Sequence, residues 1–381
     1  MRSTLTAIIL FVSICTIGFF SIPTYKFKPY HKPQKKVPKR DRIDQAWKQE
    51  KEMTTDPELG YVPRERLLDA YAYTQRLING KMGKAAISNV NWVERGPNNC
   101  GGRTRAICID LNDATRKTVW VGSVAGGLWK TTDVTAASPI WVNQNDFFAN
   151  MAITSIVQAP SNTQVMYFCT GEGNGNLDAM RGFGVWKSTN GGSTWNQLSS
   201  TISSSFNYCQ RVFAIGNGDT VFVAAQTGLY RSINGGIAFT KVLGTGISSA
   251  IGNEAEDIER MPNGVLYATM SGSASTSGTI HKSYNNGATW TTPLSLGTLT
   301  GREIEIAVSN NDTNVIWGIV EQSSQIRAVI RSTNAGISFD TTTTYPDDAD
   351  GGIPATDFSR GQAWYDLSIA VDPNNSNVCF V

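Results

Sequence analysis

Four segments of this chain share one residue pattern, and this repeat constrains the fold more than any other feature of the sequence. Each copy opens with Lys or Arg followed by Ser, continues through Asn and Gly, and ends on Trp or Phe, at 187–195, 231–239, 282–290 and 331–339. A looser copy starts at Lys130, places Asp133 at the Asn position, and reaches its aromatic residue late, at Trp141. The Ser residues of the four copies are 44, 51 and 49 residues apart. This spacing is typical of a repeated four-stranded β-sheet.

The segments that precede each copy also repeat. Two apolar runs are followed by a short third run, such as 126–130, 184–187 or 228–231, and then by the repeated pattern. This order predicts two inner strands, a third strand, a hairpin turn and an outer strand. The chain contains 36 Gly and only 17% charged residues, which suits an all-β fold with many tight turns.

The residues of the repeated pattern are suited to a structural role. An Asn or Asp side chain can accept hydrogen bonds from amides of its own turn, Gly adopts backbone angles that other residues resist, and the closing aromatic can pack between sheets. We therefore expect structural roles for Asp133, Ser188, Asn190, Gly192, Trp195, Ser232, Asn234, Gly236, Phe239, Ser283, Asn285, Gly287, Trp290, Ser332, Asn334, Gly336 and Phe339.

The pattern Ser-x-Asp/Asn-x-Gly-x-Thr-Trp/Phe is identified as the Asp-box, or BNR repeat. From about Trp92 to Val381 the chain resembles bacterial exported Asp-box propellers of the sortilin/Vps10-like and YVTN/BNR-like group. The resemblance implies a monomeric β-propeller of four-stranded blades, with the boxes at the blade periphery. The last residues match only the first two strands of a sixth blade, so we expect a fragment of a longer protein with seven or more blades.

The N-terminal region predicts export. Residues 1–22 have a positive start and an apolar run, as in a signal peptide or an uncleaved signal anchor, so we expect a secreted or cell-surface protein. The first 52 residues contain 11 Lys or Arg against 4 Asp or Glu. We interpret 23–55 as a solvated basic linker with a short helix, and expect no nucleic-acid partner. We expect a helical segment over 56–90, with a helix over 63–78, and the propeller over 91–381.

Histidine and cysteine usage excludes several kinds of site. The only histidines are His31 in the linker and His281, which we expect to be exposed on a strand near the outside of a blade. A multi-histidine zinc site is therefore impossible. Five cysteines follow the signal segment, too few for a disulfide scaffold, and we expect buried thiols. The glycine-rich segment 171–175 lacks the Lys of a phosphate-binding loop.

Glycoside hydrolysis is the enzymatic alternative, because Asp-box propellers include sialidases and xyloglucanase-type hydrolases. In the xyloglucanase-like pattern an Asp precedes the Ile-Gly-Gly of the first blade, where this chain has Val124. The sialidase pattern opens with Phe-Arg-Ile-Pro, which is absent, although Arg103 and Arg105 lie in a comparable early position. These departures argue against hydrolysis, and we assign no catalytic residue.

Acidic residues at the start of later inner strands are the main candidates for a ligand site. Inner strands converge on the axis, and strand alternation predicts that Glu303 and Asp366 point alike. An acidic axial pocket could bind Ca²⁺, the only cofactor we consider, or a basic ligand, while hydrated channel-lining residues are the alternative. The ligand-binding candidates are Arg103, Glu172, Glu256, Glu303, Glu305, Trp364, Tyr365 and Asp366, with Glu254, Asp257 and Glu259 in the same acidic run.

Two further segments have alternative interpretations. Asp347–Gly352 resembles part of a calcium loop but lacks the later bidentate Glu, which favours a solvated loop. Trp364 and Tyr365 are either a stacking platform for a sugar or peptide, or packing between blades. The sequence therefore favours an exported scaffold that binds a protein, peptide or glycan; a glycoside hydrolase and a structural role in an envelope assembly remain alternatives.

Overall fold

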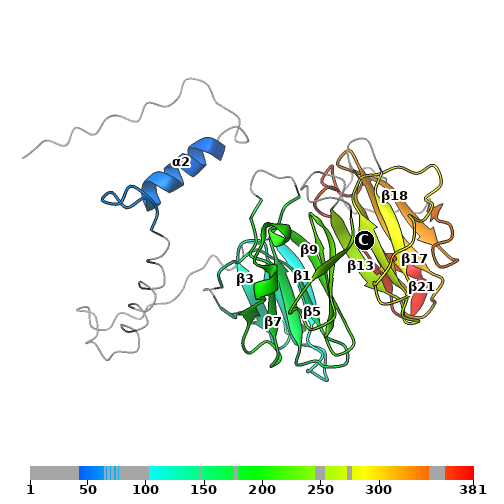
Figure 1. The fold of residues 1–381 in the computed structure, drawn as a ribbon, viewed down its shortest axis with the longest axis horizontal. Coiled ribbons are helices and arrows are strands. Elements are labelled where there is room, and N and C mark those ends of the chain that lie inside the picture. The colour runs from blue at the N-terminus through cyan, green and yellow to red at the C-terminus, as the bar shows by residue number, and fades with distance from the viewer. Residues whose placement is uncertain are drawn as a thin grey trace, which may run out of the picture. The chain divides into compact units, whose positions relative to one another are not determined.

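The computed structural model describes residues 43–63, 66, 69, 73, 76, 103–145, 148–174, 179–244, 254–272, 277–342 and 357–381. They belong to two compact units, Met1–Asn91 and Trp92–Val381 (Figure 1). The expected signal segment, most of the basic linker and the acidic loop 347–352 lie outside the described residues.

The first unit contains helix α2 (Ile43–Thr54). Lys48 and Glu52 form an ion pair of 3.8 Å one turn apart, and Lys51 lies in the last turn, where a cation favours the negative end of the helix dipole. The Asp56 carboxylate then accepts hydrogen bonds from the amides of Glu58 and Leu59 and stabilises the turn that follows. Within the part of the chain that is described, no helix is long and apolar enough to span a membrane.

The second unit is built of antiparallel sheets that follow one another along the chain. Sheet 1 contains β1 (Thr104–Ile109), β2 (Val119–Ser123), β3 (Gly127–Thr131) and β4 (Val142–Asn143); sheet 2 contains β5 (Ile153–Gln158), β6 (Met166–Thr170), β7 (Val185–Ser188) and β8 (Asn196–Gln197); sheet 3 contains β9 (Cys209–Ile215), β10 (Thr220–Ala225), β11 (Gly228–Ser232) and β12 (Thr240–Leu243). Two short 3-10 helices, η2 (Ser199–Thr201) and η3 (Ser204–Phe206), connect sheets 2 and 3.

The remaining sheets continue the same order. Sheet 4 contains β13 (Ala255–Arg260), β14 (Leu266–Met270) and β15 (Thr279–Ser283); sheet 5 contains β16 (Ile304–Val308), β17 (Ile316–Gln322), β18 (Gln325–Ser332) and β19 (Asp340–Thr341); sheet 6 contains β20 (Ala370–Asp372) and β21 (Asn375–Phe380). Sheets 1, 2, 3 and 5 have the four strands in the order that the repeat predicts.

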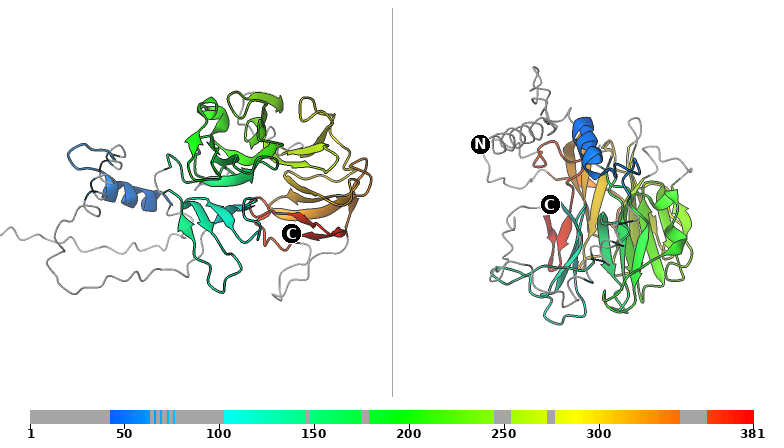
Figure 2. Two further views of the ribbon diagram at one scale, coloured as in Figure 1. Left: turned by 90° about the horizontal axis from the view of Figure 1, so that it is seen from below. Right: turned by 90° about the vertical axis from the view of Figure 1, so that its left-hand side faces the viewer.

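The first strands of successive sheets lie side by side around one axis. Strand β1 neighbours β5, β5 neighbours β9, and the series continues through β13 and β16 to β20 (Figure 2). The second strands β6 and β14 are buried at every residue, because each sheet packs between two others. Their sequences are accordingly almost continuously apolar instead of alternating.

The hydrophobic core is divided into five clusters, one between each pair of consecutive sheets. Trp120 and Ile153 pack together between sheets 1 and 2, and Tyr167 and Val212 lie in the cluster between sheets 2 and 3. Clusters of the same kind lie between sheets 3 and 4, 4 and 5, and 5 and 6. Sheets 2 to 5 are therefore each packed against two neighbours, and sheets 1 and 6 against one.

The repeated pattern forms the same hydrogen-bonded turn four times. In the first copy the Ser188 hydroxyl accepts a bond from the Gly192 amide and donates to Asn190 Oδ1, both at 2.9 Å, and Asn190 Oδ1 accepts from the Thr194 amide. The turns that start at Ser232, Ser283 and Ser332 have equivalent bonds. The four turns therefore share one set of local hydrogen bonds.

Each of these turns also rests on an aromatic residue of the preceding sheet. Gly192 packs against the Trp120 ring and Gly287 against the Phe222 ring, where a Cβ atom would overlap the ring carbons. The Tyr167 hydroxyl lies 3.3 Å from the carbonyl oxygen of Gly235, and the Tyr267 hydroxyl donates to that of Ala335 at 2.9 Å. The repeated turn therefore joins neighbouring sheets as well as ending a hairpin.

Candidate functional site

The first strands of sheets 1 to 4 carry an irregularity near their N-terminal ends. The pairing register shifts at Arg105, at Thr154, at Gln210, and at Glu256 with Asp257. An extra residue of this kind bends the strand locally and changes the direction of its side chain. Glu305 of β16 and Ser368, which lies two residues before β20, align with each other in the sequence and occupy the matching places at the axis. We call these residues the axial ring: Arg105, Thr154, Gln210, Glu256, Glu305 and Ser368.

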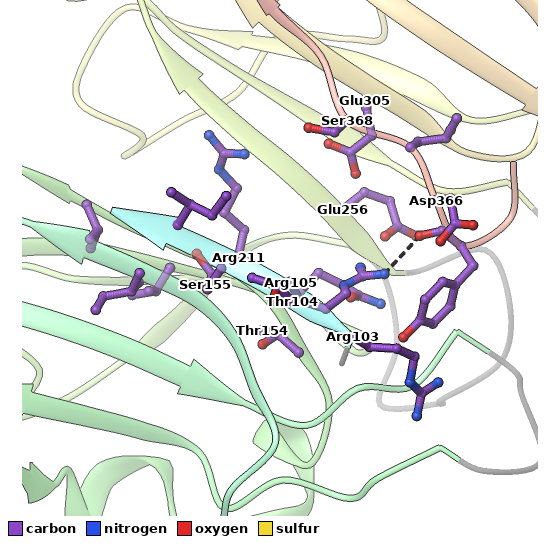
Figure 3. Close-up of a pocket in the computed structure, with 18 of the residues that line it drawn as sticks. Arg103, Thr104, Arg105, Thr154, Ser155, Arg211, Glu256, Glu305, Asp366 and Ser368 are labelled. Atoms are coloured by element: carbon purple, nitrogen blue, oxygen red, sulfur yellow. Dashed lines mark hydrogen bonds between the residues drawn. The ribbon is translucent and has the colours of Figure 1, made fainter. Parts of the chain in front are cut away.

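All six residues of the axial ring line one pocket of about 630 Å³. Arg103, Arg211, Tyr365 and Asp366 add further polar groups to its wall (Figure 3). The volume lies within the range of small-molecule sites in proteins, and the polar residues come from sheets 1 to 5 and from the segment before β20. The acidic side chains come from sheets 4 and 5 and from that segment, whereas the arginines come from β1, the residue before it, and β9. The expectation of an acidic pocket is therefore corrected to a pocket of mixed charge.

Arg211 forms ion pairs with two carboxylates beside the pocket. Its Nε lies 3.0 Å from Asp257 Oδ1, and its Nη2 contacts Glu259. Burial opposes the charge of Arg211, but Asp257, Glu259 and Glu305 raise its pKa above the usual value. Asp257 has no exposed surface and also accepts a hydrogen bond from the Ile306 amide, which links sheet 4 to sheet 5. This network stabilises the wall of the pocket.

Glu256 and Glu305 line the pocket and, unlike Asp257, form no ion pair with an arginine among the described residues. Glu256 is only 9% exposed, and among the described residues neither carboxylate has a hydrogen bond or an ion pair. Burial raises the pKa of Glu256 well above its usual range, and the neighbouring acids Glu254, Glu303 and Glu305 add to this effect. Burial and Asp257 likewise raise the pKa of Glu305, although Arg211 and Arg105 oppose the shift.

Tyr365 lies close to two arginines, Arg105 of β1 and Arg103 just before that strand. The guanidinium carbons of Arg105 and Arg103 are 4.9 and 5.7 Å from the ring centre, and Arg105 Nη1 donates to the Tyr365 carbonyl at 2.9 Å. Burial and then the nearby charge of Glu172 raise the pKa of the Tyr365 hydroxyl. Both contacts lie within cation–π distance, so this segment connects sheet 6 to sheet 1.

The candidates from the sequence are distributed unevenly around the pocket. Arg103, Glu256, Glu305, Tyr365 and Asp366 line it. Glu303 does not line it and instead pairs with Arg302 Nη2 at 3.2 Å. Trp364 is half-buried against Tyr365, with ring centres 5.4 Å apart. Glu172 is fully buried and accepts a bond from the Met180 amide.

The expectation that Glu303 and Asp366 point alike fails for a geometric reason. Asp366 does not lie in a strand: β20 starts at Ala370, and the Asp366 amide donates to the Gln362 carbonyl in a turn. Strand alternation therefore does not extend to this residue. Arg211, Gln210 and Thr154 also line the pocket but were not among the candidates from the sequence. The signal for Gln210 and Thr154 is the alignment of the first strands, in which each sheet contributes one polar residue at the same place.

His281 is buried, which corrects the expectation of an exposed residue. Its side chain is 9% exposed, Nδ1 lies 3.0 Å from the Thr291 carbonyl oxygen, and Nε2 lies 3.0 Å from Thr279 Oγ1. Burial lowers its pKa. The segment after the repeated turn returns along β15, where the Leu294 amide bonds the Ile280 carbonyl, and so covers the imidazole.

Within the described ranges there is no group of three or more His, Cys, Asp or Glu residues that could hold a metal ion. The proposed calcium loop at 347–352 lies outside those ranges. The four described cysteines have free thiols, and Cys169 and Cys209 are fully buried.

Solved structures match the arrangement of these sheets. The crystal structure of an ancestral GH74 enzyme aligns with 64% of this chain and 33% of its own, at 20% identity and a TM-score of 0.50. The chain folds as a β-propeller. The GH74 xyloglucanase from Xanthomonas campestris aligns over 73% of this propeller chain and 50% of its own, at 13% identity and a TM-score of 0.46.

An extracellular domain from B. thetaiotaomicron, described as part of a one-component system, aligns over 64% of the propeller chain and 28% of its own, at 13% identity and a TM-score of 0.45. The chain thus spans a third of the first structure and half of the second. No family model and no curated protein matches the sequence. At these identities the similarity shows the propeller fold alone.

Proposed function

We propose that this protein is an exported propeller that binds a ligand in its axial pocket and acts as a binding scaffold. The observation that carries the proposal is the axial ring, in which five sheets and the segment just before β20 each contribute one polar residue to the same pocket. Ligand sites in proteins are concave and present a few convergent polar groups. Export is supported by the apolar segment at 1–22, and a protein, peptide or glycan is the ligand class we favour.

A large side chain at Ser368 tests this proposal. Ser368 is exposed in the pocket wall, so Ser368→Trp fills the pocket without entering the core. Ser161→Trp is the matched control, because Ser161 is exposed and is not part of the pocket wall. Peptides and oligosaccharides are screened for an increase in Tm, and each hit is titrated by calorimetry. We expect Ser368→Trp to abolish binding and Ser161→Trp to retain it; a hit that binds both equally contradicts the proposal.

A glycoside hydrolase is the second candidate, and one observation favours it. Glu256, Glu305 and Asp366 place three carboxyl groups in one pocket, and burial raises the pKa of the first two. Glycosidases use a protonated carboxyl as acid and a second carboxylate as base or nucleophile. A panel of polysaccharides assayed for reducing ends tests this function. Hydrolysis that is lost in Glu256→Gln or Glu305→Gln would support it, and the absence of any hydrolysis would reject it.

A further inference from the structure

Several hydrogen-bond acceptors in the wall of the axial pocket have no partner among the described residues. Glu256 is more than nine-tenths buried, borders the pocket, and has no hydrogen bond or ion pair within the described part of the chain. Glu305 on the neighbouring strand is half-buried, also borders the pocket, and likewise has no hydrogen bond or ion pair within the described part of the chain. Gln210, also in the wall, donates to Glu254 and Asn174 through Nε2, while its buried Oε1 accepts no hydrogen bond.

The cations near these acceptors have other partners. Arg211 binds Asp257 and Glu259, and Arg302 binds Glu303. Arg105 donates to the Tyr365 carbonyl and stacks on its ring. A buried carboxylate with no partner is unfavourable unless it is protonated or paired, and a cation that enters the pocket would pair with it.

The arrangement of the three acceptors favours an organic cation over a metal ion. Among the described residues no cluster is suited to a metal ion. Glu256 lies on β13 and Glu305 on β16 (Figure 3). Gln210 lies on β9, so the three acceptors come from consecutive sheets around the axis. A guanidinium group presents five N–H donors in one plane and an ammonium group presents three, and either can bond several acceptors at once.

We infer that Glu256, Glu305 and Gln210 form a binding site for an organic cation, a guanidinium or ammonium group of the ligand, such as an arginine or lysine side chain. This inference rests on the proposed function, because it assigns the chemistry of a ligand in the same pocket. Asp366 at the exposed part of the wall adds a further negative charge that attracts such a group.

Two probes that differ in charge test the inference on the full chain. Nα-acetyl-L-arginine amide and its neutral analogue Nα-acetyl-L-citrulline amide are titrated by calorimetry at neutral pH. Because hydrogen bonds to charged groups are about twice as strong as neutral ones, we expect the citrulline probe to bind about tenfold to a hundredfold more weakly. Equal affinities, or no binding of the arginine probe, would overturn the inference.

Substitutions in the pocket test whether the arginine probe binds at these acceptors. Glu256→Gln keeps the size of the side chain and should remove the preference for the arginine probe, while Glu58→Gln, an exposed residue outside the propeller, should leave it unchanged. Thermal unfolding of both variants shows whether each is folded. Gln210→Leu removes only a neutral acceptor, so it should weaken the binding of the arginine probe and retain part of the preference for arginine over citrulline. Full preference in Glu256→Gln would overturn the assignment, as would Ca²⁺ binding that depends on Glu256.

The same experiments separate this inference from the proposed function. If a screened ligand binds in a way that Ser368→Trp blocks, but the arginine probe does not bind, the pocket remains a ligand site and the cation assignment fails. If the arginine probe binds equally well to Ser368→Trp and to the unsubstituted protein, its site lies elsewhere, and the cation assignment fails as well.

Discussion

The contact between Gly192 and the Trp120 ring makes a quantitative prediction. Gly192 has a φ of +85° and is buried, and a Cβ atom there would lie 2.6 Å from Trp120 Cζ2. Gly192→Ala therefore has two costs: about 1 kcal/mol for the left-handed backbone, and about 1 to 3 kcal/mol for the overlap with the ring. We expect a loss of about 2 to 4 kcal/mol in the free energy of unfolding.

Gly216→Ala is the matched control for this variant. Gly216 also has a positive φ, +59°, but a Cβ atom there would have no neighbour within 4 Å. It should lose only the backbone cost of about 1 kcal/mol. Guanidinium denaturation of the full chain measures both values. Because Trp120→Phe shortens the opposing ring, Gly192→Ala combined with it should cost less than the sum of the two single variants. Equal losses for Gly192→Ala and Gly216→Ala would refute the reasoning.

Three further predictions concern buried polar groups. Arg211→Leu leaves the fully buried Asp257 without its cation and should cost about 3 to 5 kcal/mol in urea unfolding; a loss below about 1 kcal/mol, typical of an exposed pair, would contradict this. Burial raises the pKa of Glu303 from 4.5 to about 8; Arg302 opposes this shift, and Glu321 and Glu254 add to it. The folded state therefore binds the proton of the Glu303 carboxyl more tightly than the unfolded state does. Stability should therefore fall as the pH rises from about 4.5 to about 8, and the Tm of Glu303→Gln should depend less on pH in that range; an unchanged slope would argue against it. Cys169 and Cys209 are fully buried, and burial raises the pKa of both thiols, so iodoacetamide should modify them only after unfolding; mass spectrometry of native samples measures this, and rapid native labelling would disprove it.

The repeated turn could be predicted from the sequence because its contacts are local. Every bond of the Ser188 and Asn190 side chains reaches a residue at most four positions away, so the residue types alone indicate the geometry. The order of strands in each sheet follows from the same repeat. The burial of His281 could not be predicted in this way, because the residues that cover it belong to the returning segment after the turn.

The pocket was only partly predictable, because its side chains are directed by irregular strands. A register shift at Glu256 and Asp257 interrupts the alternation of side chains along β13, and no residue pattern in the sequence predicts the extra residue. Glu256, Glu305 and Asp366 were candidates because of their charge. Arg211 was not, since its role depends on Asp257 of the next sheet, 46 residues away in the chain. Contacts between sheets are long-range, and strand periodicity does not encode them.

The seating of each repeated turn on the preceding sheet gives the propeller a direction of assembly. Trp120 of sheet 1 is available before the turn at Gly192 has been synthesised, and the same order holds for Phe222 and Gly287. A growing chain therefore always offers a completed aromatic surface to the next hairpin, so that each sheet serves as a template for its successor. Early hairpins need not wait for partners from the far end of the chain, which limits the time during which unpaired strand edges are exposed.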